Sequence, residues 1–335
     1  AVGHTSLHLN TTGASNVAVG KGALDANTTA SNNVAVGAAA LGANTTGASN
    51  VAIGASALLA NTTGANNTAL GFAALDAAIL PSSNTSIGSA SLSVNVHSSQ
   101  NTAVGSNSLE SHNLSSAGNG LNTAVGYNSG LAVTTGVQNV IIGALAADAL
   151  TTGDFNVALG TSALGALTTA DENTALGHIA LGANTTGANN TAVGSTALDA
   201  NTTASSNTGV GASSLGSNTT GASNTAVGAA ALRDNTTAAN NTAVGSNALL
   251  LNTTGTQNTS VGENSSAANT TGDTNVAFGV NALAANTTAG SNTAIGTNAL
   301  LVNTTGTQNV AVGKDALDAN TTANNNVAVG YSALG

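Results

Sequence analysis

The sequence predicts an all-β protein: a parallel β-solenoid, a β-roll or β-helix of about twenty coils, each coil one 17-residue repeat. The first observation is the pentapeptide Asn16–Gly20 (NVAVG), which returns every 17 residues through twenty copies, with one four-residue insertion between Gly105 and Gly126. A fixed period of this size is the signature of a repeat architecture. The second observation is that short β-branched runs alternate with Gly and Asn, which is typical of strands and turns and unfavourable for helices. Equivalent residues should therefore stack at the strand spacing of ~4.8 Å.

We number the repeat from its first Asn, so that Asn16 is position 1 and Gly20 is position 5. Position 4 is always bulky and apolar, position 9 is Leu in most repeats, and positions 12 to 14 usually read Asn-Thr-Thr. Stacked Asn side chains can hydrogen-bond along the axis of such a stack. The predicted structural ladders are represented by Asn16, Asn33, Asn50, Gly20, Gly37, Gly54, Val19, Val36, Leu24, Leu41, Asn27 and Asn44.

The repeat predicts one continuous solenoid over residues 1–335, with no separate globular domain. The coils between about residues 76 and 167 are less regular, and the insertion at about residues 110–121 should form a protruding loop. Position 12 changes from Asn to an apolar residue in three successive repeats, at Val133, Leu150 and Leu167. A buried column requires such a block exchange, because a lone apolar residue would leave neighbouring amides unpaired. The Asn-Thr-Thr segments match a glycosylation sequon, but the block exchange favours an internal Asn ladder.

The charges locate the expected surface. All sixteen charged residues lie at positions 6, 7, 10, 11, 16 and 17, which we interpret as exposed corners because burying a charge is costly. Strand side chains alternate between two faces, and neither the face of positions 2 and 4 nor that of position 3 ever carries a charge. We therefore expect both faces to be covered, with Val19 facing the coil interior and Ala18 facing another copy of the chain. The expected partner is the chain itself, as a homo-oligomer.

Composition argues against several functions. A net charge of −10 with only three basic residues opposes nucleic-acid binding, and no apolar run approaches the ~20 residues of a membrane span. There is no Cys, no catalytic constellation and no phosphate-binding glycine motif. His97 and His112 could lie on neighbouring coils, but a solvated loop is the simpler interpretation than a metal site. We expect no enzyme, no cofactor and no metal.

The stretch from Asn241 to Gly255 (NTAVGSNALLLNTTG) resembles the head repeats of YadA-like trimeric autotransporter adhesins. It is also similar to the 17-residue repeats of bacterial and phage tail-fibre proteins. The resemblance implies a homotrimeric, extracellular fibre on a cell surface or a virion tail, used for adhesion through a host or surface receptor. The accessible surface for such contact would include an exposed loop with Glu110, His112 and Asn113.

Two alternatives stay open at this stage. One is a phage tail-fibre shaft, which differs from a cellular adhesin in where the fibre is attached. The other is an ice-binding β-solenoid, because flat, uncharged, Thr-rich solenoid faces are what such proteins present. The adjacent Thr28 and Thr29 should point to opposite faces, however, so a two-column Thr face is not expected from the Thr-Thr segment.

Overall fold

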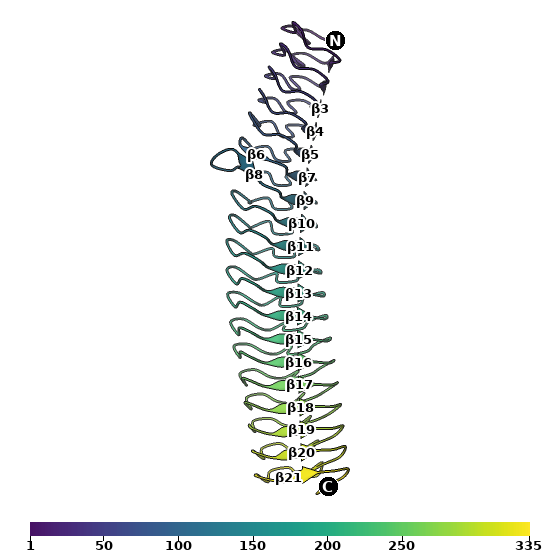
Figure 1. Cartoon of the computed structure of the whole chain (residues 1–335), viewed down its shortest axis with the longest axis vertical. Coiled ribbons are helices and arrows are strands. Elements are labelled where there is room, and N and C mark those ends of the chain that lie inside the picture. The colour runs from purple at the N-terminus through teal and green to yellow at the C-terminus, as the bar shows by residue number, and fades with distance from the viewer. The chain divides into compact units, whose positions relative to one another are not determined.

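The computed structural model describes residues 1–335 and consists of short strands, turns and bends, without any helix. The chain forms two compact units, Ala1–Asp171 and Glu172–Gly335. In each unit, three-residue strands at positions 2 to 4 pair in parallel with the strand one repeat further along the sequence (Figure 1). The parallel β-solenoid with a 17-residue coil is therefore confirmed. No segment forms a helix long and apolar enough to cross a bilayer.

The strands of the first unit, in the order of their pairing, are β1 (Val17–Val19), β2 (Val34–Val36), β3 (Val51–Ile53), β4 (Thr68–Leu70), β5 (Thr85–Ile87), β7 (Thr102–Val104), β9 (Thr123–Val125), β10 (Val140–Ile142) and β11 (Val157–Leu159). The less regular coils therefore keep their strands. A second, two-stranded sheet in this unit pairs β6 (Ser98–Ser99) with β8 (Gly118–Asn119).

The strands of the second unit, also in the order of their pairing, are β12 (Thr174–Leu176), β13 (Thr191–Val193), β14 (Thr208–Val210), β15 (Thr225–Val227), β16 (Thr242–Val244), β17 (Thr259–Val261), β18 (Val276–Phe278), β19 (Thr293–Ile295), β20 (Val310–Val312) and β21 (Val327–Val329).

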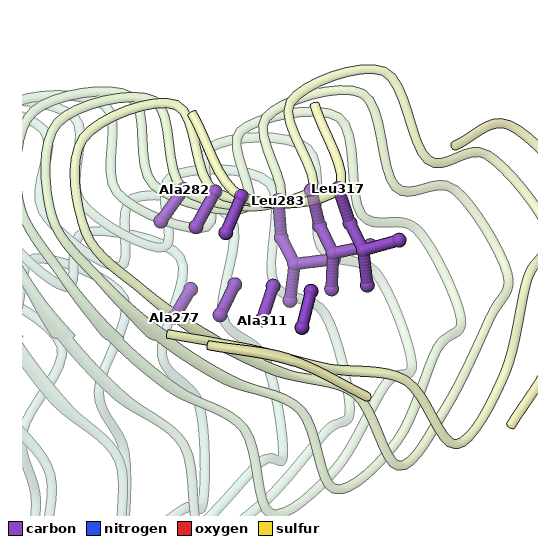
Figure 2. Packing of buried hydrophobic residues seen from close by; sticks show 10 residues of the cluster. Ala277, Ala282, Leu283, Ala311 and Leu317 are labelled. Atoms are coloured by element: carbon purple, nitrogen blue, oxygen red, sulfur yellow. The ribbon is translucent and has the colours of Figure 1, made fainter. Parts of the chain in front are cut away.

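The coil interior is thin and is filled mainly by small side chains. The alanines at position 3, such as Ala277 and Ala311, form one wall, and the Ala-Leu pair at positions 8 and 9, such as Ala282 and Leu283, forms the other (Figure 2). All of these side chains are buried. Repeated along the stack, they give a continuous apolar core although most coils contribute only one large aliphatic residue to it.

The strands face the opposite way to the sequence prediction. Ala18 is 1% exposed and lies in the coil interior, whereas Val19 is 39% exposed and points outward. Val36 is also only partly buried. The physical reason is space: the Leu of position 9 and the Ala of position 8 already occupy the interior, which leaves room for one small side chain from the strand. Since strand side chains alternate, placing position 3 inside necessarily puts positions 2 and 4 outside.

The backbone conformation at position 9 explains how the adjacent side chains of positions 8 and 9 can both point into the coil interior. Leu24 and Leu41 have φ of 52°, in the left-handed region that side chains other than Gly usually avoid. This conformation costs roughly 1–2 kcal/mol for a residue with a side chain. Burying the Leu side chain contributes roughly 1.5–3 kcal/mol, which offsets that cost. Leu24 and Leu41 are fully buried and form the predicted ladder.

Two asparagines of each regular coil bind one carbonyl. The side-chain Nδ2 atoms of Asn207 (position 1) and Asn218 (position 12) both donate to the carbonyl of Gly221 (position 15), each at 2.9 Å. Asn218 also donates to Asn201 Oδ1 of the preceding coil at 3.1 Å. The backbone N–H of Asn224 donates to Asn207 Oδ1 at 2.9 Å, which joins the next coil to this one. The amides are therefore satisfied both within a coil and between coils.

The asparagines that the sequence assigned to ladders follow the same scheme. Asn33 and Asn44 both donate to the Gly47 carbonyl, and Asn44 donates to Asn27 Oδ1. Asn27 and Asn44 are fully buried, so the Asn-Thr-Thr segments supply an internal ladder as expected. The apolar exchange at Val133, Leu150 and Leu167 is likewise buried as a block; these three side chains have no exposed surface.

The glycine of position 5 meets two constraints at once. Gly211 has φ of 132°, which L side chains rarely adopt, and a Cβ atom built on it would lie 2.5 Å from the Gly228 carbonyl oxygen of the next coil. Gly20, Gly37 and Gly54 have similar positive φ values. The backbones of successive coils approach too closely here for any side chain, which explains why this position is Gly in every repeat.

Replacing Asn218 by Ala should destabilise its coil by roughly 2–4 kcal/mol, because Asn235 Nδ2 and Asn201 Oδ1 both lose a buried partner. Hydrogen exchange of the amides around Thr219 and Thr236 measures this directly as faster local opening. Thr220→Ala, at an exposed position of the same coil, should change exchange little. Equal effects of the two substitutions would contradict the ladder.

Replacing Gly211 by Ala should destabilise the coil by roughly 2–4 kcal/mol, through backbone strain and the clash with the Gly228 carbonyl. The matched control is Gly216→Ala at position 10, where the nearest atom to the new Cβ is 3.3 Å away and φ lies outside the strained range. Urea unfolding followed by circular dichroism should separate the two variants. A Gly211→Ala protein as stable as the control would refute the proposed constraint.

Candidate functional site: the strand face and the inserted loop

The most distinctive surface is the outward face of the strands, which we call the strand face and define as positions 2 and 4 of every coil. Position 2 is Val or Thr, and position 4 is Val, Ile, Leu or Phe278. In the second unit its members are Thr174, Leu176, Thr191, Val193, Thr208, Val210, Thr225, Val227, Thr242, Val244, Thr259, Val261, Val276, Phe278, Thr293, Ile295, Val310, Val312, Val327 and Val329. Register pairing places each column in line, so the strand face is a regular, uncharged, largely apolar strip.

Every aromatic residue of the chain lies on or beside this strip. Phe278 is at position 4, Phe72, Tyr127 and Tyr331 are at position 6, and Phe155 is at position 17, so the last four flank the strand in sequence. All five are more than half exposed. The interior beside the strand cannot hold them. Apart from the Gly of position 5, ten positions of the repeat are at least partly exposed, and the aromatic residues occupy only three of these. Aromatic residues are enriched in the centres of protein interfaces, which singles out the strand face.

Charges border the strip without entering it. Lys21, Glu263 and Lys314 are at position 6, and Glu172 is at position 17. Lys314 lies 3.4 Å from the Asp315 carboxylate and 5.6 Å from the centre of the Tyr331 ring. An apolar centre with a polar rim is the usual composition of a protein interface.

The inserted loop is the second irregular feature of the surface, and it projects beside β6 and β8 (Figure 1). Its exposed part runs from residue 115 to residue 119. The insertion projects as the sequence predicts, but His112, which the sequence assigned to its exposed surface, does not belong to that surface. His112 is fully buried, while Glu110 and Asn113 are only partly exposed.

His112 is a structural residue because it occupies position 12, where most coils have the ladder Asn. Its Nε2 atom lies 2.9 Å from Ser98 Oγ and 3.4 Å from Asn122 Nδ2. Asn113 Oδ1 accepts hydrogen bonds from the backbone N–H groups of Val96 and His97, at 3.0 and 3.2 Å. Burial lowers the pKa of the His112 imidazole to about 4. The imidazole ring of His112 therefore takes the place of the Asn side-chain amide found at position 12 of most coils. This role could be recognised only by aligning the repeats, which assigns His112 to position 12.

The histidines and carboxylates of the structure do not gather into a metal-binding cluster. No group of three or more His, Asp or Glu side chains could hold a metal ion, and the surface has no pocket. His97 Nδ1 lies 3.1 Å from the Leu114 carbonyl oxygen, so it supports the loop. Burial raises the pKa of the Asp76, Asp148 and Asp199 carboxyls, but these residues are far apart in the sequence and stand at position 10 of separate coils.

Comparison of the chain with protein-family models, with curated proteins and with solved structures found no significant match in any of the three. The repeat and the strand face are therefore the features of the chain that indicate its function. Sequence reasoning missed the outward direction of that face. The available signal was the small residue at position 3, which is what a thin interior demands.

Replacing His112 by Asn should remove part of the acid sensitivity of the first unit. Because the folded-state pKa is about 4 and the unfolded value is 6.5, the unfolded chain takes up a proton first as the pH falls. The stability due to the neutral ring is complete above pH 6.5 and is lost as the pH falls towards 4, by about 3 kcal/mol in all.

Urea unfolding at pH 7 and pH 4.5 should show a smaller loss of stability for His112→Asn than for the unsubstituted chain. His178→Asn, at an exposed site, is the control and should behave like the unsubstituted chain. An unchanged pH dependence in His112→Asn would show that the buried ring has no part in acid sensitivity.

Proposed function

We propose that this chain is a structural segment of an extracellular fibre, in which copies of the chain pack against one another through the strand face. The single observation that carries the proposal is that strip: in each unit it is uncharged, largely apolar and at least partly exposed, and all five aromatic residues lie on or beside it. A continuous apolar patch of this kind on a soluble protein marks a surface that another molecule covers.

The area of the strand face supports association. Ten strands spaced at ~4.8 Å span about 45–50 Å, and the two columns with their side chains are about 10 Å wide, so the second unit offers roughly 500 Å². The strand face of the first unit adds a similar area. Each unit thus offers an area towards the low end for specific interfaces, of which the standard class buries ~800 Å² per partner. Three copies is the assembly that the resemblance of the repeat to adhesin heads implies.

The hydrogen bonds between successive coils suit the chain to a load-bearing role. Each coil is joined to the next by backbone hydrogen bonds and by Asn side chains, as in Asn235 to Asn218 at 2.8 Å. We propose that the fibre serves surface attachment on a cell or forms the shaft of a phage tail fibre. In either setting residues 115–119 are the most accessible irregular surface for contact with a receptor.

One observation favours a second candidate function, the binding of ice. From β12 to β17 the strand face carries a column of Thr beside a column of aliphatic residues, in register and without charge. The Thr-Thr segments do not provide such a face. The hydroxyl of Thr202 at position 13 donates to the Thr219 carbonyl at 3.1 Å, while the threonine beside it at position 14 points outward.

The mass of the protein in solution tests the first proposal. Light scattering should give a multiple of the 31.5 kDa chain mass, and Val227→Asp with Ile295→Asp should dissociate the assembly because each partner would have to bury the new carboxylates. The control is Thr220→Asp with Thr288→Asp, which adds the same charge at exposed positions outside the strand face. A monomer of unsubstituted protein would overturn the fibre, and a monomer with thermal hysteresis would establish ice binding instead.

A further inference from the structure

A strand face that repeats every 17 residues leaves the alignment of two copies poorly defined. A slip by one coil moves a partner by only ~4.8 Å and exchanges Thr for Thr and Val for Val over most of the strip. Sheet register is weakly specified wherever successive residues are alike. A fibre with one defined structure therefore needs at least one coil that differs from its neighbours on this face.

The coil of β18 differs from both of its neighbours in this way. In β18 and the residues after it, positions 2, 4 and 6 are Val276, Phe278 and Val280, and all three are exposed, at 38%, 56% and 43%. Phe278 is the only aromatic residue at position 4 of any repeat. We call Val276, Phe278 and Val280 the β18 cluster.

The coils on either side do not reproduce the β18 cluster. The preceding coil has Thr259, Val261 and Glu263 at these positions, and the following coil has Thr293, Ile295 and Thr297. The β18 cluster is thus a patch with three adjacent apolar side chains between coils that are polar at positions 2 and 6.

We propose that the β18 cluster meets the same cluster of a second, parallel copy of this chain and so fixes the register of the assembly. This inference rests on the proposed packing of copies through the strand face. The occupant is a second copy because positions 2 and 4 carry no charge anywhere, so two identical faces meet without repulsion. In register, Phe278 contacts Phe278 of the partner, and such aromatic pairs interact favourably beyond the area they bury.

A slip by one coil loses this match. Phe278 then lies opposite the aliphatic residue of position 261 or 295, and the volume that its ring filled is left partly empty. Position 4 carries an aromatic ring in one coil only, so every slipped alignment loses the Phe278 pair. Phe278 is accordingly a specificity-determining residue for self-assembly. The columns of repeated Thr and Val side chains add buried area to the interface, but they do not favour one register of the two chains over another.

Cross-linking from a fixed point on the strand face tests the inference. A photo-cross-linking amino acid replaces Val244, two coils from Phe278, in oligomers mixed from ¹⁵N-labelled and unlabelled full-length chains. Mass spectrometry then locates each attachment on the partner chain. In the otherwise unsubstituted protein the attachments should fall on residues 241–257, the coil that contains the probe. Attachments around Val312 would instead show an antiparallel pair centred on Phe278 and would overturn the parallel arrangement.

Phe278→Val should keep the oligomer but raise several-fold the share of attachments on residues 224–240 and 258–274, one coil to either side. Adding Val210→Phe should restore the single register, since an aromatic pair at another coil serves equally well. Leu251→Ala, which removes an exposed apolar side chain outside the strand face, is the control and should change nothing.

The possible failures are distinguishable. If no cross-link joins labelled to unlabelled chains, the proposed self-assembly is wrong. If such cross-links form but Phe278→Val leaves their positions unchanged, the assembly stands and the role of the β18 cluster is refuted. Attachment of the probe only to a different protein would show that the strand face binds a foreign partner. That result would overturn both the proposed self-assembly and the proposed role of the β18 cluster.

Discussion

The structure depends on the carbonyl of position 15, which accepts hydrogen bonds from two buried asparagine side chains. In one coil these donors are Asn207 and Asn218, and the acceptor is Gly221. Since the same asparagines also bind their equivalents in adjacent coils, each coil provides the hydrogen-bond partners that its neighbour needs. A buried amide without a partner is costly, so a coil is stable only within a stack. The regular 17-residue period keeps these donors and acceptors aligned, as for Asn218 and Asn201. The four-residue insertion loops out between Asn101 and Asn122, where the Asn122 N–H still donates to Asn101 Oδ1.

The small cross-section of the coil connects the fold to the proposed function. The interior accepts one Ala from the strand and an Ala-Leu pair from the following turn, so the larger aliphatic residues of positions 2 and 4 must lie outside. An ordinary globular domain would bury such residues in its own core. Here they form the strand face, and the apolar surface that one chain cannot cover becomes available to other copies. The aromatic residues follow the same logic, because Ala and Leu side chains already fill the interior next to the strand and leave no space there for a Phe or Tyr ring.

The inserted loop shows how the ladder adapts to an irregular coil. His112 takes the place of an asparagine and contacts Ser98 and Asn122, while Asn113 caps two backbone N–H groups of the preceding coil. The stack continues beneath the loop, since β7 and β9 pair directly. Replacing an amide by an imidazole introduces a titratable group into the interior, and burial lowers its pKa to about 4. The loop is therefore supported by the least acid-tolerant part of the ladder, and residues 115–119 are its longest exposed stretch.

The sequence alone determined the coil, its period and the internal position of the Asn ladders, because each of these depends on identical residues recurring at identical spacing. It also located the exposed corners, since charges avoid buried positions. It could not decide which way the strand faces. Alternation requires positions 2 and 4 to oppose position 3, but it is equally satisfied with Val19 or Ala18 inside. That choice depends on the width of the interior, which the left-handed conformation of Leu24 sets by directing two adjacent side chains inward. The tertiary structure resolved it in favour of Ala18 and so placed the apolar strip on the surface.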